Sequence, residues 1–149
     1  MAITTPDYID DYGTCDETYS TLRVYHETLP PTNVTKRLSL EPHEQQFKDE
    51  DNSSKGGVST LINGWFLSTQ DKVDSLDSRR HIDWLISQVG DRRHQIEKMH
   101  SDGFEIDITS YWLSRSGHGG PTISPHQMRA LSMLGIEVNW DVYFHEGED

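Results

Sequence analysis

Hydrophobic and polar residues alternate along three stretches of the chain, at residues 21–27, 104–109 and 136–145. In the first, Leu22 and Val24 fall on one side and the residues between them on the other. Alternation with a period of two is typical of a strand that buries one face. Each stretch is therefore predicted to be a β-strand, and the last has the cleanest pattern.

The strand that begins near residue 104 continues into Tyr111, Trp112 and Leu113, three consecutive large apolar groups. Such a run favours a central strand that is covered on both faces near its end. Two more β-prone runs, at residues 58–62 and 65–69, flank Asn63-Gly64, which is a strong hairpin signal. One strand at 64–69, preceded by a loop, is the alternative.

Apolar residues at three- and four-residue spacing predict helices. Asp91 is a candidate N-cap within the longest helical region, after Gly90 interrupts it. Ser124, followed by Pro125 and by Gln127, forms the signature of a capping box with proline at the first helical position. We expect helices at residues 29–40, 77–89 and 91–101, and in the segment after Ser124.

Three segments lack periodicity. Residues 1–19 are polar and acidic and are predicted to be a disordered arm, in which Cys15 is exposed. Residues 43–57 are predicted to be a mobile loop, and residues 146–149 an acidic tail. A single domain at residues 20–145 remains.

The predicted elements follow the order β-α-β, α-α, β-α-β. Alternating strands indicate a sheet with one face packed on helices and the other partly in contact with water. The expected fold class is α+β, arranged as a ferredoxin-like split βαβ sandwich with a mainly antiparallel sheet and helices on one face. A doubly wound parallel sheet is less favoured, because only residues 111–113 have the pattern of a strand buried on both faces.

The net charge of −12 is concentrated at the two ends of the chain. Residues 1–20 and residues 137–149 each carry five acidic residues and no lysine or arginine. Nucleic acid is not an expected partner, since binding phosphates needs a basic face. The acidity favours attraction to a basic protein, and the alternative is that it serves solubility alone.

No apolar run approaches the roughly 18–20 residues that a membrane span needs, so no membrane association is expected. The N-terminus lacks the basic and apolar regions of a signal peptide. Cys15 is the single cysteine, which excludes an internal disulfide framework. We therefore expect a cytoplasmic location.

An ordered set of motifs resembles the bacterial family named domain of unknown function 4279. These motifs are Thr21–Tyr25, Gly64–Thr69, Val73–Asp77, His81–Leu85, Tyr111–Trp112, Ser116–Ser124 and Asp141–Phe144. The resemblance covers most of residues 20–145 and implies a small, stand-alone cytoplasmic bacterial protein. It carries no catalytic assignment.

The glycine-rich loop that ends the strand beginning near residue 104 is the candidate ligand site. Its glycines would let backbone N–H groups approach an anion, its arginine could bind a phosphate or carboxylate, and its histidine could titrate near neutral pH. The loop matches neither the phosphate-binding loop nor the serine nucleophile motif, so no catalytic residue is assigned. A tight loop whose glycines serve backbone geometry alone is the alternative. The candidate residues are Arg115, Ser116, Gly117, His118, Gly119 and Gly120.

The eight histidines show no pair at metal-ligand spacing and no neighbouring cysteines, so no metal site and no cofactor are predicted.

Tyr25, Tyr143 and His145 fall on the non-core sides of their predicted strands. If these strands are neighbours, they form an aromatic and acidic surface of the kind that binds proteins. The sequence therefore favours a non-enzymatic protein-binding module, for example an immunity-like antagonist of a basic partner. The alternative is an anion or small-molecule site at residues 115–120, with or without catalysis.

Overall fold

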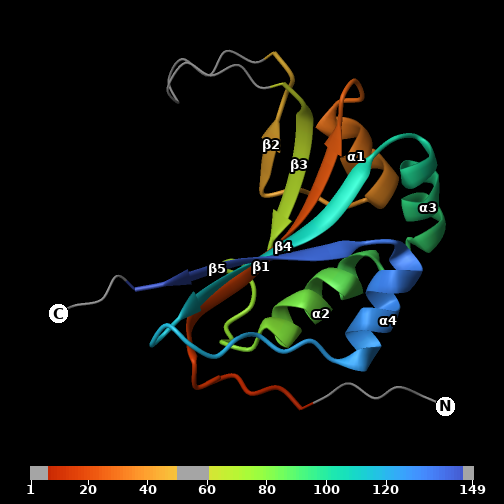
Figure 1. The fold of residues 1–149 in the computed structure, drawn as a ribbon. Coiled ribbons are helices and arrows are strands. Elements are labelled where there is room, and N and C mark those ends of the chain that lie inside the picture. Colours follow the sequence, from red (N-terminus) through yellow and green to blue (C-terminus); the bar gives the residue numbers. More distant parts are fainter. Residues whose placement is uncertain (1–6, 50–60, 146–149) are drawn as a thin grey trace.

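A five-stranded sheet forms the frame of the protein, in the spatial order β2-β3-β1-β4-β5 (Figure 1). The structure is a computed structural model that describes residues 7–49 and 61–145. Three of the strand pairs are antiparallel, and β4 and β5 pair in parallel. The strands are β1 (Cys15–His26), β2 (Glu44–Gln46), β3 (Asn63–Ser68), β4 (Glu105–Ser114) and β5 (Glu137–Phe144).

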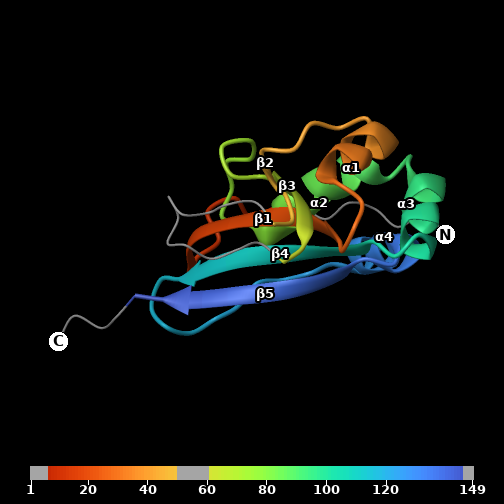
Figure 2. The same cartoon turned by 90° about the horizontal axis from the view of Figure 1, so that it is seen from above.

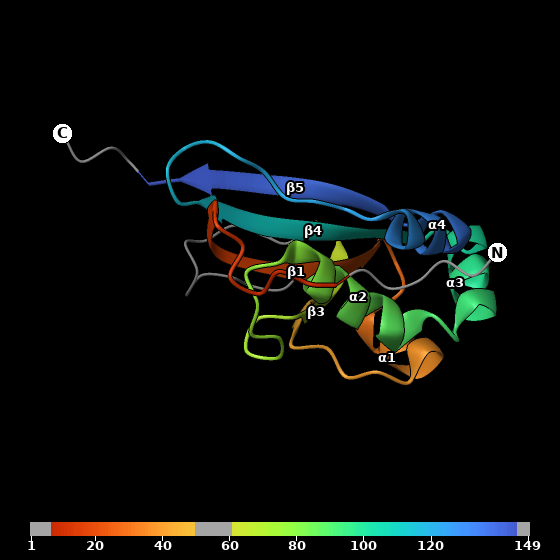
Figure 3. The ribbon, with the colours of Figure 1, turned by 90° about the horizontal axis from the view of Figure 1, so that it is seen from below.

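Within the described residues, four helices pack against one face of this sheet (Figures 2 and 3). The buried side chains of these helices and alternate residues of the strands together form one hydrophobic core. The α+β class and the mainly antiparallel sheet are thereby confirmed. The helices are α1 (Pro31–Leu38), α2 (Ser78–Val89), α3 (Arg93–Ser101) and α4 (Pro125–Leu134).

Local signals place the helix ends. The capping box predicted at Ser124 and Gln127 is present at the start of α4, and Asp77 caps α2 by accepting a hydrogen bond from the Arg79 N–H. Asp91 was predicted to cap α3, and this is wrong. The N-cap is Arg92, without a side-chain hydrogen bond.

Alternate residues of β1 and β4 divide the sheet into two faces. The covered face, which contacts the helices, includes Leu22, Val24, Ile106 and Ile108, all nearly free of solvent contact. Towards the Cys15 end of β1 this face becomes polar, and the buried hydroxyls of Ser20 and Ser110 are 2.6 Å apart. Hydrogen bonds replace apolar packing there, as buried hydroxyl groups require.

The N-terminal segment, residues 7–14, is bonded to α2 and to the turn before it. The Ile9 N–H donates to Asp77 Oδ2 at 2.8 Å, and the Asp10 carboxylate accepts from Arg80 Nε at 2.8 Å. The disordered arm predicted at 1–19 is therefore wrong for residues 7–19, of which residues 15–19 belong to β1. Residues 1–6 lie outside the described residues.

Cys15 was predicted to be exposed, and it is fully buried. Burial raises the pKa of its thiol to about 11, so the group stays protonated at neutral pH. The acidic tail predicted at 146–149 lies outside the described residues.

The predicted turn at Asn63-Gly64 is also wrong, because both residues lie inside β3. Gly64 pairs with Tyr25 on one side and with Gln46 on the other. The alternative, a single strand near 64–69, is the better description of the region. The strand that pairs with the outer edge of β3 is β2, which lies in the predicted mobile loop 43–57. Residues 50–60 are outside the described residues. They contain part of the predicted hairpin and part of the predicted mobile loop 43–57.

Candidate functional site

The face of the sheet opposite the helices is the candidate functional site. We call it the open face. It carries the second set of alternate residues of β1, β4 and β5, and none of the four helices lies over it (Figures 1 and 2). The residues of this face on the three strands are Glu17, Tyr19, Thr21, Arg23, Tyr25, Glu105, Asp107, Thr109, Tyr111, Leu113, Glu137, Asn139, Asp141 and Tyr143.

Three tyrosines from three strands lie next to one another on this face, and we call Tyr19, Tyr111 and Tyr143 the tyrosine cluster. Tyr19 pairs with Tyr111 across β1 and β4, and their rings are stacked with centroids 4.9 Å apart. The Tyr143 ring lies 5.4 Å from that of Tyr111, and half of Tyr143 is exposed, at 49%. Aromatic pairs at these distances are attractive, so the cluster is a firm apolar patch open to solvent.

Negative charge surrounds the tyrosine cluster. Partial burial raises the pKa of Tyr19, and the charges of Glu17 and Asp141 raise it further. The pKa of Tyr111 is raised by burial and then by Glu17. Among the described residues neither Glu17 nor Asp141 has an ion-pair partner. The hydroxyls of Tyr19 and Tyr111 therefore stay protonated, beside two carboxylates that have no ion-pair partner among the described residues.

The other end of the open face contains an arginine that is already paired with a carboxylate. Arg23 donates two hydrogen bonds to the Asp107 carboxylate, both at 2.7 Å. The Arg23 guanidinium also lies 5.6 Å from the centroid of the Tyr25 ring, which meets Phe66 edge to face. The cation at this end is already paired and stacked. This end also carries the carboxylates of Glu105 and Glu137, so among the described residues unpaired acids occur at both ends of the open face, and the tyrosine cluster distinguishes the first end.

Asp16 joins three segments that are distant in the sequence. It sits at an irregularity in the pairing of β1 with β4. Its carboxylate accepts from His145 Nε2 at 2.6 Å and from Arg115 Nε at 3.1 Å. These bonds, that of His145 first, lower the pKa of Asp16. Two candidates assigned to different sites, Arg115 and His145, are thus brought together on one carboxylate.

The glycine-rich loop is closed on itself and on the N-terminal segment. Ser114 Oγ accepts from the Gly117 N–H at 3.0 Å and donates to the His118 carbonyl at 2.9 Å, and Ser116 Oγ lies 3.0 Å from His118 Nδ1. Gly119 has a φ of +86°, and a Cβ there would come within 2.5 Å of Thr14. Glycine is therefore needed for both backbone conformation and close approach.

The candidates named from the sequence are placed as follows. Of the partner-surface set, Tyr143 belongs to the tyrosine cluster, His145 binds Asp16, and Tyr25 lies at the opposite end of β1 beside Gly64 and Glu105. The condition that the first and last strands are direct neighbours is not met, because β4 lies between them. Of the loop set, Arg115 is held by Asp16 and also donates to the Cys15 carbonyl at 3.2 Å. Gly120 accepts from the Tyr12 hydroxyl through its carbonyl, at 2.7 Å.

Tyr19 and Tyr111 were missed as functional candidates. Tyr19 lies in the segment predicted to be disordered, and Tyr111 was assigned to a strand end buried on both faces. A signal was present, since Tyr19, Thr21 and Arg23 continue one alternation through the start of β1. The polar residues between them, such as Ser20, concealed it.

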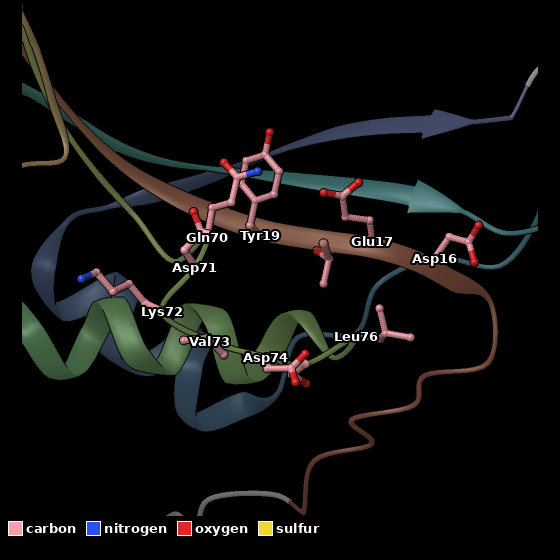
Figure 4. Close-up of a pocket in the computed structure, with 11 residues that line it drawn as sticks. Asp16, Glu17, Tyr19, Gln70, Asp71, Lys72, Val73, Asp74 and Leu76 are labelled. Carbon is pink, nitrogen blue, oxygen red and sulfur yellow. The ribbon is translucent and has the colours of Figure 1, made fainter.

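A groove of about 520 Å³ lies beside the tyrosine cluster (Figure 4). One wall is the start of β1, residues 16–19, and the other is the loop of residues 70–76. Tyr19 and Glu17 line the groove and belong to the open face as well. Two further cavities, of about 690 and 600 Å³, are lined in part by Tyr8 with Arg80 and by Arg23 with Glu105. None of the three is lined by residues 115–120.

The family model described as a domain of unknown function, DUF4279, matches residues 16–145. The chain belongs to the DUF4279 family. The matched range contains the tyrosine cluster, both walls of the groove and the glycine-rich loop, and it begins after the N-terminal segment. No curated protein and no solved structure matches the chain.

The described residues of this DUF4279 chain contain neither a metal-binding cluster nor a membrane-spanning helix. In residues 7–49 and 61–145, no three or more histidine, cysteine or acidic residues are grouped so that they could hold a metal ion. In the same ranges no helix has the length and apolar character needed to cross a bilayer.

Proposed function

We propose that this DUF4279 protein is a non-enzymatic binding module that engages a basic partner protein through its open face. The observation that carries the proposal is the tyrosine cluster, a stacked apolar patch flanked by the unpaired carboxylates of Glu17 and Asp141. A docking surface typically combines rigid aromatic anchors with charged groups around them.

The chemistry of the cluster favours cationic side chains in the partner. Lysine and arginine can stack on tyrosine rings, and nearby carboxylates strengthen that attraction. The net charge of −12 adds long-range attraction to a basic protein. An immunity-like antagonist of a basic toxin, acting in a bacterial cytoplasm, is one specific form of this proposal.

The alternative site at residues 115–120 has less support. The Arg115 guanidinium is bonded to Asp16 and to the Cys15 carbonyl, so an anion would compete with both. Ser124 and Gln127 cap the N-terminus of the following helix. A thermal-shift screen of phosphates, nucleotides and carboxylates tests the alternative, and a ligand that shifts the wild type but not an Arg115→Ala variant would revive it.

The binding role is tested by capture at low ionic strength on immobilised wild type and on two variants. Tyr111→Ser interrupts the cluster, whereas Met133→Ser removes a similarly apolar, 45% exposed side chain from α4, away from the open face. We expect a basic protein that is retained by the wild type and Met133→Ser, lost by Tyr111→Ser, and released by salt. Equal retention by all three proteins, or release independent of salt, would contradict the proposal.

We also propose the ferredoxin-like arrangement for strands β1 to β4. In its support, these strands lie in the order β2-β3-β1-β4. β1 and β2 are joined through α1, run in the same direction and are separated by β3, which is antiparallel to both. In this interpretation α4 and β5 are an addition next to β4. An experimental structure with another strand order would contradict it.

A further inference from the structure

The start of β1 forms an open strand edge inside the sheet. β3 pairs with β1 only as far as Ser68, opposite Thr21, and after Thr69 the chain turns away, with the Lys72 and Val73 N–H groups bonded back to the Thr69 carbonyl. Residues 16–19 therefore have β4 on one side, and none of the strands in residues 7–49 and 61–145 pairs with their other side. The groove runs along this open side (Figure 4).

The backbone of Thr18 points into the groove. The Ser20 N–H and carbonyl bond Thr69 on the β3 side, both at 2.9 Å. Backbone groups in a strand point the same way every second residue, so those of Thr18 point to the same side. Thr18 lines the groove, and the described residues supply no partner for its N–H and carbonyl on that side. An unpaired strand edge can pair with an added strand, which would satisfy both groups.

The unpaired charged side chains that line the groove favour a cationic occupant. Asp16 is already paired with Arg115 and His145. Glu17 lies on one wall of the groove and Asp71, Lys72 and Asp74 lie on the other. No ion pair joins any of these four residues to a described residue. Three carboxylates against one ammonium leave the groove negative. A second copy of a chain with a net charge of −12 is disfavoured for the same reason.

We infer that the groove binds an extended, lysine- or arginine-rich segment of a partner protein, which pairs with residues 16–19 of β1 as an added strand. The inference rests on the proposed function, because the segment is taken to belong to the same basic partner. At about 3.3 Å per residue, this edge accommodates roughly four residues of an extended chain. The adjacent tyrosine cluster would bind the rest of that partner.

The test uses hydrogen exchange of the Thr18 amide in the whole protein. The probe is a peptide of about seven residues that alternates lysine and valine, offered at millimolar concentration. We expect it to slow exchange at Thr18 by about tenfold or more. The same peptide with every second amide N-methylated, and a glutamate–valine peptide of equal length, should give no protection.

Two charge reversals sharpen the test. Asp74→Lys, in the wall of the groove, should abolish the protection. Asp91→Lys, at the exposed turn between α2 and α3, should leave it unchanged. The inference is overturned if the lysine–valine peptide leaves Thr18 unprotected, or if the N-methylated peptide protects it equally.

These outcomes are separable from those of the proposed function. A basic protein that needs Tyr111, combined with an unprotected Thr18, would overturn the inference alone. A protected Thr18, combined with capture that does not depend on Tyr111, would overturn the proposed role of the open face alone.

Discussion

The covered and open faces are built from the same strands, and they differ in what their side chains contact. On the covered face, Leu22 and Ile108 are buried against helices and contribute to folding. On the open face, Tyr19 and Tyr111 contact each other, and no helix lies over them. Large aromatic groups that the core does not need, set among unpaired acids, support the proposal that this face serves binding rather than stability.

Breaking an ion pair should give the largest difference in stability between the covered and the open side of the sheet. Arg79 is 9% exposed and binds Asp77, which is fully buried. Arg79→Met would leave that carboxylate buried and unpaired, which costs about 3–5 kcal/mol of unfolding free energy. On the open face the Arg23–Asp107 pair is partly exposed, so Arg23→Met should cost about 1 kcal/mol or less. Arg79 lies in α2 and Asp77 is its N-cap, so this pair belongs to the helix layer that covers the sheet. Urea denaturation measures both losses, and equal losses would refute the distinction between the covered and the open side of the sheet.

Truncation of apolar groups should give the next largest difference. Leu22→Ala removes a fully buried side chain and should cost about 2–5 kcal/mol, through lost burial and a cavity. Tyr19→Ala removes one stacked ring from the open face and should cost about 1 kcal/mol. The comparison would fail if thermal or urea denaturation found Tyr19→Ala to be the more damaging change.

Acid should destabilise the protein on the covered side first. Burial alone would raise the pKa of Asp77, but hydrogen bonds from Arg79 and from the Ile9 and Arg79 N–H groups outweigh it and lower the pKa. A carboxyl whose pKa is lower in the folded state stabilises the protein above its unfolded value, about 3.9, and loses that contribution as the pH falls through the folded value. The melting temperature should therefore decrease as the pH is lowered below about 4. The decrease should be less steep in Asp77→Asn than in the wild type. If the melting temperatures of the two proteins decreased equally with falling pH, Asp77 would be excluded as a cause of the acid destabilisation.

Local patterns were sufficient where neighbouring residues decide the structure. The alternation at 104–109 and 136–145 predicted β4 and β5, and Ser124 with Gln127 predicted the start of α4. The turn at Asn63-Gly64 was wrong because a long-range contact decides it. A Cβ on Gly64 would come within 2.9 Å of Gln46 Cγ on the neighbouring strand β2, so glycine fits there inside the strand.

The candidate site was predicted only in part. Tyr143 and the acidic surroundings were anticipated, but the partners of Tyr143 were not, because the strand order that joins Tyr19, Tyr111 and Tyr143 is a tertiary property. The first half of β1 was missed because Thr18 and Ser20 are buried by hydrogen bonds rather than by apolar packing. Polarity alone therefore suggested a disordered arm.

The proposal that the open face is the binding surface is tested by measuring both binding and stability in one variant, Tyr111→Ser. Calorimetric titration with the captured basic protein, at about 0.05 M and 0.5 M salt, gives the affinity of wild type, Tyr111→Ser and the control Met133→Ser. We expect Tyr111→Ser to bind at least about tenfold more weakly at low salt while losing about 1 kcal/mol of stability, and Met133→Ser to bind as the wild type does. Wild-type affinity in Tyr111→Ser would contradict the assignment of the open face as the binding surface.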